Sequence, residues 1–236
     1  MATKSSNVVI VDAVRTTIGR RNGGLSTLHP ADVLGLVQKG IVDRTGIDPA
    51  QIEQVVGGCV SQVGEQAFNL TRTAWLAAGL PISTAATTVD TQCGSSQQAT
   101  SLAASLVGSG VVDVALACGV EVMSRVPIGA GGKKELGLGV PIPKSYFGQY
   151  EMTSQFEGAE RIADHWGITR ADTDLFGYNS QQRAARAWAE DRFAGQYLEV
   201  TAPDADENGN LLDSTHTVKR DEGIRETTLE KLATLK

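Results

Sequence analysis

An α/β fold with a mostly parallel sheet is predicted by two observations on this sequence of 236 residues. Short runs of β-branched and apolar residues alternate with longer segments of helical character, which is the pattern of right-handed βαβ units. One of these runs, 111–122, is nearly all apolar, as expected of a fully buried strand. A hydrophobic content of 41% with 20% charged residues favours a folded chain over a disordered one.

Strands and helices alternate through the first 124 residues. Four apolar or β-branched runs predict strands, at 8–11, 54–59, 87–92 and 111–122. The intervening segments predict helices at 30–39, 68–78 and 94–108. Pro30 suits the first turn of the first helix, which ends at Gly40 or continues to Gly46.

The sequence after Ser124 has a different character. A glycine-rich stretch reaches Gly139, and two amphipathic patterns then predict helices at 153–166 and 170–190. The polar stretch 204–210 predicts a hairpin or the tip of a loop. This half of the chain is therefore expected to be largely helical.

Four residues of these later helices have predicted structural roles. Asp172 or Thr173 is expected to cap the second helix, because short polar side chains bind the free N–H groups of a first turn. Trp166 and Trp188 are expected to anchor the packing of the two helices, since large aromatic side chains more often fill a core than hold a ligand.

Composition excludes several classes of function. The net charge is −6 and no basic block is present, which argues against nucleic-acid binding. The three cysteines form no Cys-x-x-Cys pair, which argues against a disulfide framework or a zinc site and favours a reducing, cytoplasmic compartment. The polar residues 1–7 do not resemble a signal peptide, and no run has the roughly eighteen apolar residues of a membrane span. No metal site or prosthetic group is expected.

Cys93 is the strongest candidate for chemistry. A β-branched run leads into it and a long run of small residues follows, which predicts a strand, a tight turn and a helix that begins at the thiol. Unpaired N–H groups and the helix dipole favour a thiolate there, and the thiolate is the nucleophilic form. The alternative from local physics is a buried structural cysteine.

The residues around Cys93 resemble a known nucleophile segment. The run 90–99, Asp-Thr-Gln-Cys-Gly-Ser-Ser-Gln-Gln-Ala, is similar to that of the thiolases, the family of acetyl-CoA acetyltransferases and 3-ketoacyl-CoA thiolases. Further segments resemble markers of the same family in the same order, at 11–19, 69–74, 78–81, 118–124, 180–184 and 221–225. The resemblance therefore extends over nearly the whole chain.

The resemblance implies a layered fold of the thiolase type, with a mostly parallel five-stranded sheet and a largely helical insertion. Residues 1–124 would form the N-terminal α/β domain that carries the nucleophile. Residues 125–236 would form the loop domain that covers coenzyme A, and the chain would end before the C-terminal domain of the family. The complete enzyme would be a homodimer or a homotetramer.

The resemblance also implies the reaction and its residues. Cys93 would form an acyl thioester during thiolytic cleavage of a 3-ketoacyl-CoA, or during the reverse Claisen condensation, and its backbone N–H would help to bind the oxyanion. Arg225 would contact the nucleotide portion of coenzyme A, which is a substrate and not a prosthetic group. The alternative for Arg225 is an ion pair with Asp221 or Glu222.

Two departures from the family pattern refine this reading. Residues 150–160 retain only the Ala159-Glu160 end of a motif near the acyl pocket, which argues against the usual short-chain substrate. In detail the chain resembles actinobacterial thiolases of bulky, steroid-derived acyl-CoAs. The family motifs Asn-Glu-Ala-Phe, Gly-His-Pro and Cys-x-Gly are absent, and neither His29, His165 nor His216 lies in a Gly-His-Pro context. The chain is therefore expected to be inactive alone.

Other interpretations stay open at this point. A ketoacyl synthase-like condensing enzyme would share the fold and the nucleophile but would lack the insertion. A non-catalytic coenzyme A-binding or subunit-partner module is the alternative outside enzymes. The acids near the predicted strands, Asp12, Asp113 and Glu121, are expected to bind backbone groups at strand ends and not to take part in catalysis.

Overall fold

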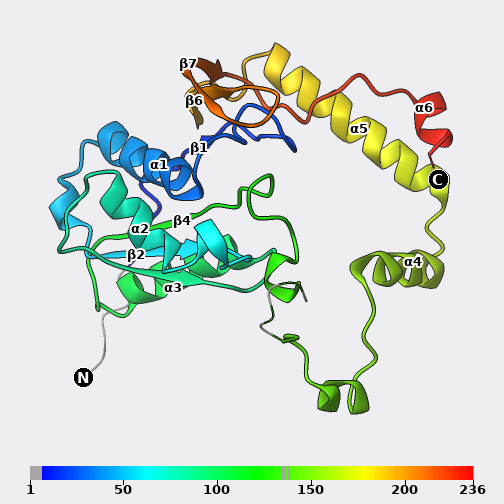
Figure 1. Cartoon of the computed structure of the whole chain (residues 1–236), viewed down its shortest axis with the longest axis horizontal. Coiled ribbons are helices and arrows are strands. Elements are labelled where there is room, and N and C mark those ends of the chain that lie inside the picture. Colours follow the sequence, from blue (N-terminus) through cyan, green and yellow to red (C-terminus); the bar gives the residue numbers. More distant parts are fainter. Residues whose placement is uncertain (1–6, 134, 136, 138, 236) are drawn as a thin grey trace. The chain divides into compact units, whose positions relative to one another are not determined.

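The computed structural model describes residues 7–133, 135, 137 and 139–235. The chain divides into two compact units (Figure 1). The first comprises Met1–Gly131 and Gly195–Glu222, and the second comprises Gly132–Ala194 and Gly223–Lys236. Residues 195–222 thus belong to the first unit, although they lie within the predicted 125–236 region. The assignment of functional domains to 1–124 and 125–236 stays a prediction.

A three-stranded parallel sheet forms the centre of the first unit. Its strand order is β3-β2-β4, and the strands span Gln54–Gly58 (β2), Ala85–Val89 (β3) and Ala115–Gly119 (β4). The register places Gly58 beside both Val89 and Gly119, so the three strands end together. Parallel neighbours need a crossover connection, which is supplied by the helices α2 (Leu70–Ala77) and α3 (Ser95–Gly108).

Helix α1 (Pro30–Thr45) has a signal for each of its ends. The His29 side chain caps the first turn by accepting the N–H of Ala31 at 3.1 Å, and Pro30 occupies the first helical position, where no N–H is needed. Gly46, at φ 68°, closes the helix in the left-handed conformation and donates to the carbonyl of Val42. The longer of the two predicted helices is confirmed.

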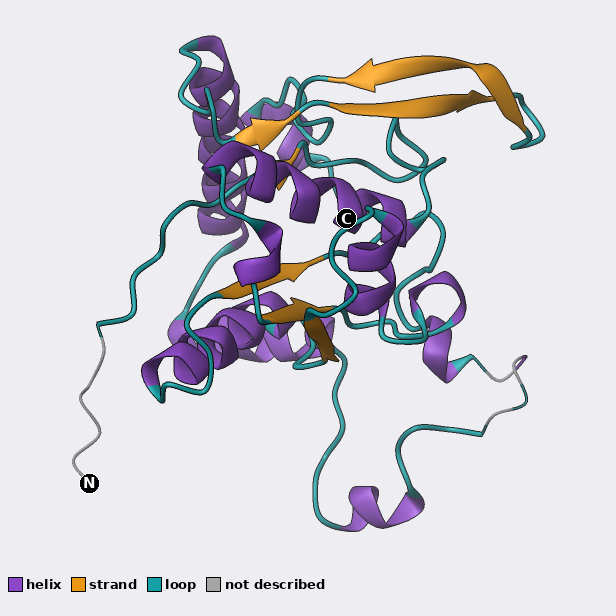
Figure 2. Cartoon of the chain, turned by 90° about the vertical axis from the view of Figure 1, so that its left-hand side faces the viewer, coloured by secondary structure: helices purple, strands orange, loops and turns teal. Residues whose placement is uncertain are grey.

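The side chains of β2 alternate between two parts of the core. Val55 is fully buried in a cluster with Val42 of α1 and Trp75 of α2. The next residue, Val56, packs against Ala99 of α3. Because successive side chains of a strand point to opposite faces, α1 and α2 cover one face of the sheet and α3 covers the other (Figures 1 and 2).

Two strand pairs complete the first unit. β1 (Arg15–Thr16) is parallel to β5 (Tyr197–Leu198), and β6 (Val200–Ala205) forms an antiparallel hairpin with β7 (Leu211–Val218), seen as a long ribbon in Figure 2. The α/β class with parallel strands is confirmed, but the single five-stranded sheet is wrong. The five parallel strands are divided between a three-stranded sheet and the β1–β5 pair, because β1 has only two residues and pairs with β5 alone.

Two strand predictions need correction. The segment 8–11 forms no strand, and Val9, Ile10 and Val11 are 72%, 80% and 84% exposed. An apolar run becomes a buried strand only where a neighbour pairs with it, and none of the described strands does so here. The strand expected over 111–122 is shorter, and β4 is partly exposed, because it lies at an edge of its sheet.

The predicted hairpin tip at 204–210 is confirmed. The Asp206 carboxylate accepts the backbone N–H groups of Asn208 at 2.9 Å and Asn210 at 2.8 Å, which fixes the turn between β6 and β7. Aspartate is favoured in such turns because its short side chain bonds to the backbone a few residues on.

The second unit contains three helices, α4 (Gln155–Trp166), α5 (Arg170–Ala189) and α6 (Leu229–Ala233). Arg170 of α5 donates to the carbonyls of Leu232 and Leu235 in and after α6, at 2.7 and 3.0 Å. None of the residues that the structure describes in this unit is buried. The second unit also contains a short 3₁₀-helix at Lys144–Gly148, and other short 3₁₀-helices of the chain span Pro49–Gln51, Gly64–Gln66 and Ala130–Gly132.

The helix predictions for this unit are confirmed, but two residue roles are not. Thr169 caps α5, not Asp172 or Thr173: its side chain accepts from the Asp172 N–H, and the Asp172 carboxylate accepts from the Thr169 N–H in return. Trp166 is 67% exposed, so within the described residues it does not anchor a core. Trp188 lies against Phe193 with ring centroids 5.5 Å apart.

Candidate functional site

Cys93 lies at the carboxyl ends of the central strands. β3 ends at Val89, and the thiol follows four residues later, directly before Gly94, which is the N-cap of α3. Because Val89, Gly58 and Gly119 are neighbours in the sheet, the turn that carries Cys93 stands over the ends of all three strands. In parallel α/β sheets this edge is where ligands bind. The predicted order of strand, turn and helix is confirmed, but the thiol lies one residue before the N-cap and not within the first turn of α3. Cys93 is exposed.

The turn has a conformation that few residues adopt. Gln92 has a φ of 52°, in the left-handed region that costs a non-glycine residue roughly 1 kcal/mol. Its N–H donates to the Asp90 carboxylate at 2.7 Å. On the other side, Ser95 donates its hydroxyl to the Gln92 carbonyl at 2.6 Å and accepts the Thr91 N–H at 3.0 Å. Polar side chains thus hold the residue before the thiol from both directions.

Two glycines allow α3 to begin directly on the strand ends. A Cβ atom at Gly58 would lie 2.5 Å from the carbonyl carbon of Ser95 and from the backbone nitrogen of Ser96. A Cβ at Gly119 would collide with the Ser96 hydroxyl. Neither position has room for a side chain. The glycines at the ends of β2 and β4 therefore set how close the first turn of α3, and with it Cys93, lies to the sheet.

The other two cysteines are held as neutral thiols. Burial raises the pKa of Cys59 to about 12, and the nearby Glu121 carboxylate adds to the rise. Burial raises the pKa of Cys118 to about 11, although the Gln38 amide, which donates to its sulfur, acts in the opposite direction. Since the thiolate is the reactive form, neither is suited to nucleophilic chemistry at neutral pH. Cys93 is exposed, whereas Cys59 is buried and Cys118 is half-buried.

Glu121 organises the loop that follows β2. Its carboxylate accepts the N–H groups of Val60 at 2.9 Å and Ser61 at 3.2 Å, and the side-chain amide of Gln66 at 2.8 Å. The fully buried Gln66 also accepts the N–H of Val122 at 3.0 Å. The expected structural role of Glu121 is confirmed, because its oxygens are used by backbone and amide groups.

Asp12 shares this structural character. It accepts the N–H of Ala13 at 2.8 Å and forms an ion pair with Arg44 at 2.7 Å. The role of Asp113 stays a prediction.

Arg225 is exposed in the second unit. Its backbone N–H donates to Gln181 at 3.1 Å, and its guanidinium has no hydrogen bond or ion pair among the described residues. The two acids of the alternative ion pair, Asp221 and Glu222, have partners within the first unit. Asp221 binds Arg15 at 2.8 Å, and Glu222 accepts the Gly24 N–H at 3.0 Å. The contact between Arg225 and coenzyme A stays a prediction.

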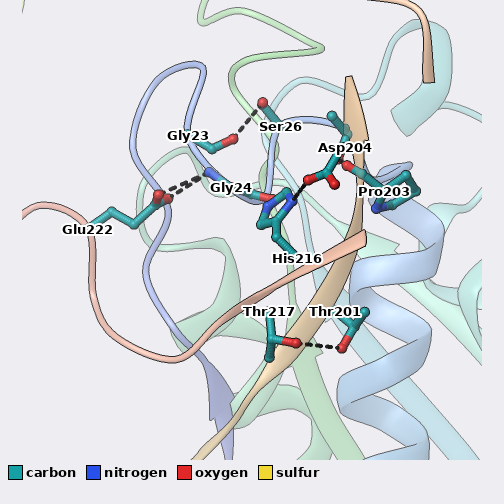
Figure 3. A network of polar contacts seen from close by, with 10 residues as sticks. Gly23, Gly24, Ser26, Thr201, Pro203, Asp204, His216, Thr217 and Glu222 are labelled. Carbon is teal, nitrogen blue, oxygen red and sulfur yellow. Dashed lines mark hydrogen bonds and ion pairs between the residues drawn. The ribbon is translucent and has the colours of Figure 1, made fainter. Parts of the chain in front are cut away.

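Sequence reasoning missed a polar network in the first unit, drawn in Figure 3. His216 on β7 lies with Nδ1 2.6 Å from the Asp204 carboxylate on β6 and Nε2 2.9 Å from the Gly24 carbonyl. A carboxylate and a carbonyl are both acceptors, so this arrangement favours the imidazolium form, in which both ring nitrogens donate. The Asp204 hydrogen bond, followed by the Gly24 carbonyl, raises the His216 pKa. The β6–β7 register pairs Ala202 with His216, so Asp204, two residues further along β6, lies near the ring. This register is the signal that could have identified the contact.

This network lines a polar cavity of about 1100 Å³. Its walls include Arg20, Arg125, Asp206 and His216, and they do not include Cys93. The cavity is therefore separate from the thiol. Among the described residues, no group of three or more histidine, cysteine, aspartate or glutamate side chains is placed to hold a metal ion.

Comparison with known proteins shows the family to which the chain belongs. A family model described as the N-terminal domain of thiolases matches residues 8–236. The chain belongs to the thiolase family. It is 40% identical to a steroid 3-ketoacyl-CoA thiolase of Mycobacterium tuberculosis over 96% of this chain and 54% of that protein. It is also 40% identical to a 3-ketoacyl-CoA thiolase of Pseudoalteromonas translucida over 98% of this chain and 57% of that protein.

A solved structure agrees with the sequence relatives. The crystal structure of the Bacillus anthracis acetyl-CoA acetyltransferase superposes with a TM-score of 0.81 at 28% identity, covering all of this chain and 59% of that one. The chain thus spans about half the length of the relatives that it matches. The thiolase-type fold and the likeness to an actinobacterial steroid thiolase are confirmed. No described helix is long and apolar enough to cross a membrane.

Proposed function

We propose that the protein to which this chain belongs is an acyltransferase that cleaves 3-ketoacyl-CoA by thiolysis, with Cys93 as the nucleophile. The observation that carries the proposal is the position of this exposed thiol, on a tight turn before α3 and over the ends of three parallel strands. The two other thiols are disfavoured because their pKa values are raised to about 12 and about 11. Membership of the thiolase family supports the reaction class.

The chemistry runs in two transfers. The Cys93 thiolate attacks the 3-keto carbon, and the bond between carbons 2 and 3 breaks to leave the chain as an acyl thioester on the sulfur. The departing carbanion takes a proton and leaves as acetyl-CoA. The thiol of a second coenzyme A then attacks the thioester, transfers its proton, and releases the shortened acyl-CoA and the Cys93 thiolate. Claisen condensation is the same sequence reversed, and covalent catalysis divides one difficult step into two easier ones.

This chain supplies the nucleophile and part of the electrostatic stabilisation. Cys93 lies directly before Gly94, the N-cap of α3, and therefore close to the positive end of the helix dipole. The backbone N–H of Cys93 is suited to bind the oxygen that becomes negative in the tetrahedral intermediate. The proton transfers belong to the histidine and second cysteine of the family motifs, which the 236 residues do not contain.

The substrate is assigned to the class of bulky acyl groups. The motif near the family's acyl pocket is reduced to Ala159-Glu160. The similar protein of Mycobacterium tuberculosis is a steroid 3-ketoacyl-CoA thiolase. Arg225 is assigned to the nucleotide portion of coenzyme A, because its exposed guanidinium is not used by the described residues and has the planar geometry that phosphate groups bind. Residues 125–236 then serve as the coenzyme A-covering domain, and the complete enzyme acts in the cytoplasm as a homodimer or homotetramer.

Affinity labelling tests the nucleophile and the ligand together. The chain is treated with bromoacetyl-CoA or with bromoacetamide, which carry the same leaving group, and the adducts are mapped by mass spectrometry. We expect the adduct on Cys93, a faster reaction with bromoacetyl-CoA, protection by free coenzyme A, and loss of the adduct in Cys93→Ser. Adducts spread over Cys59 and Cys118 would refute the assignment.

A matched pair of arginine variants tests the coenzyme contact. Arg225→Ala is expected to slow bromoacetyl-CoA and to leave bromoacetamide unchanged. Arg21→Ala removes the same charge from an exposed position in the first unit and serves as the control. Equal slowing in both variants would mean that only net charge matters and that Arg225 makes no specific contact.

A further inference from the structure

We propose that Ser95 is a positioning residue that holds the turn at Gln92 and thereby presents the Cys93 thiol for reaction. The inference rests on the proposed function, in which Cys93 is the nucleophile. Ser95 itself does not touch the reacting atoms. Its role follows from the hydrogen bonds that it makes across the turn and from the burial of its side chain at the start of α3.

The Ser95 hydroxyl closes the turn from within. It accepts the Thr91 N–H at 3.0 Å and donates to the Gln92 carbonyl at 2.6 Å. The backbone N–H of Ser95 donates to the same carbonyl at 3.0 Å. One residue therefore binds both ends of the peptide segment that leads into Cys93. Ser95 is 4% exposed, so water does not replace these bonds if the hydroxyl is removed.

The turn needs such a support because glutamine does not favour the backbone conformation that Gln92 has here. Its φ of 52° lies in the left-handed region, which glycine and asparagine adopt more readily than glutamine. The other side-chain support, the Asp90 carboxylate bound to the Gln92 N–H, comes from an exposed residue. The buried support at Ser95 is therefore the one that holds the strained residue most firmly.

The position of Ser95 is itself fixed from below. The backbone of Ser95 packs against the end of β2, because a Cβ atom at Gly58 would lie 2.5 Å from the carbonyl carbon of Ser95. The helix that follows is anchored to the sheet by the buried Ala99 and Ala103. Removing the hydroxyl would therefore release the turn while α3 keeps its place. The thiol would then lose its fixed position at the start of α3, and with it the orientation in which it reacts.

The experiment measures the rate constant for alkylation of each thiol by iodoacetamide between pH 5 and pH 10, in the full 236-residue chain. We expect Ser95→Ala to slow Cys93 by at least about fivefold at neutral pH, the equivalent of one lost hydrogen bond. Ser101→Ala is the matched control, because Ser101 lies on the same helix, is exposed, and donates only to the Gln97 carbonyl at 3.1 Å.

A second variant separates the turn from the rest of the fold. Glycine adopts positive φ without strain, so Gln92→Gly in the Ser95→Ala background is expected to restore most of the Cys93 rate. The rates of Cys59 and Cys118 are expected to stay low in every variant. Unchanged reactivity of Cys93 in Ser95→Ala would overturn the inference. Faster labelling of Cys59 and Cys118 in that variant would also overturn it, since the effect would then be loss of the fold.

The same data distinguish this inference from the proposed function. If Cys93 of the unaltered chain reacts no faster than Cys59 and Cys118, the proposed nucleophile is wrong and the positioning role falls with it. If Cys93 is the fast thiol in the unaltered chain and in Ser95→Ala alike, the proposed function stands and only the role of Ser95 is wrong.

Discussion

The two compact units of the chain are built on different principles. In the first, Trp75, Leu34 and Val55 are at most 2% exposed, and helices cover both faces of a parallel sheet. In the second, no described residue is buried, and Phe156 and Trp166 of α4 are 76% and 67% exposed. Both units form helices, so helix formation by itself does not indicate a core.

The difference shows where local signals suffice and where packing decides. The second unit has well-formed ends and surface pairs: a capping box at Thr169, and ion pairs four residues apart such as Arg161–Glu157 and Arg170–Asp174. These are contributions of a few tenths to about 1 kcal/mol each. In the first unit the decisive residues are those, like Gly58, whose size is dictated by a neighbour in the fold.

The largest expected effect is the difference in stability between two tryptophan substitutions, one in each unit. Trp75→Ala removes a fully buried side chain and should lower the free energy of unfolding of the first unit by about 4 kcal/mol. Trp166→Ala changes an exposed side chain and should change stability by no more than about 0.5 kcal/mol. Urea unfolding, monitored by hydrogen exchange of peptides from β2 and α4, measures the free energy of unfolding of each unit separately. Equal effects of the two changes would refute the contrast.

Glycine substitutions should have opposite signs in the two units. Gly58→Ala places a methyl group against the backbone of Ser95 and Ser96, and should destabilise the first unit by about 3 kcal/mol. Gly177 lies within α5 with open space around its Cα, so Gly177→Ala should stabilise that helix by about 0.5–1 kcal/mol. Hydrogen exchange of α3 and α5 reports the two results. A stabilising Gly58→Ala would contradict the close approach of α3 to β2.

The capping box gives a smaller and local effect. Thr169→Ala removes the side chain that accepts the Asp172 N–H, and should destabilise the start of α5 by about 1 kcal/mol. Thr173→Ala is the control, because its hydroxyl donates only to the Arg170 carbonyl within the helix. Exchange of the first turn of α5 should accelerate in the first variant alone. Equal acceleration in the control would show that Thr169 is not the cap.

The smallest expected effect is the pH dependence of the β6–β7 hairpin. Because the His216 pKa is raised in the folded state, the imidazolium binds its proton more tightly there than in the unfolded chain. Its contribution to stability is complete below the unfolded value of about 6.5 and is lost as the pH rises through the higher folded value. Asp204 stays ionised in this range, since its own pKa is lowered, first by Ser214 and then by His216.

A comparison of two histidine variants measures this dependence. His216→Gln should speed hydrogen exchange of the hairpin relative to the unaltered chain at pH 6, and the difference should shrink by pH 8.5. His165→Gln, at an exposed position on α4, is the control and should show no such trend. A difference that stays constant with pH would mean that the ring is neutral in the folded chain.

The sequence was most informative where the structure of a segment is determined by residues close together in the chain. The helix that starts at Pro30 and the turn at Cys93 were predicted because capping, glycine placement and small-residue runs act within a few residues. The segment 8–11 was mistaken for a strand because its apolar character does not specify a partner. The contact of His216 with Asp204 and Gly24 joins residues 12 and 192 positions apart. No local pattern contains that information: the hairpin register brings Asp204 to the ring, and the contact with Gly24 depends on the packing of the hairpin within the first unit.

The most direct test of the central claim is acyl transfer onto Cys93 itself. The complete enzyme to which this chain belongs is incubated with an acyl-CoA, digested, and mapped by mass spectrometry for a thioester that neutral hydroxylamine removes. We predict acylation of Cys93, its reversal by added coenzyme A, and its absence in Cys93→Ser. Acylation of Cys59 or Cys118 instead, or a Cys93 adduct that coenzyme A does not remove, would contradict the assignment of Cys93 as the residue that carries the acyl group.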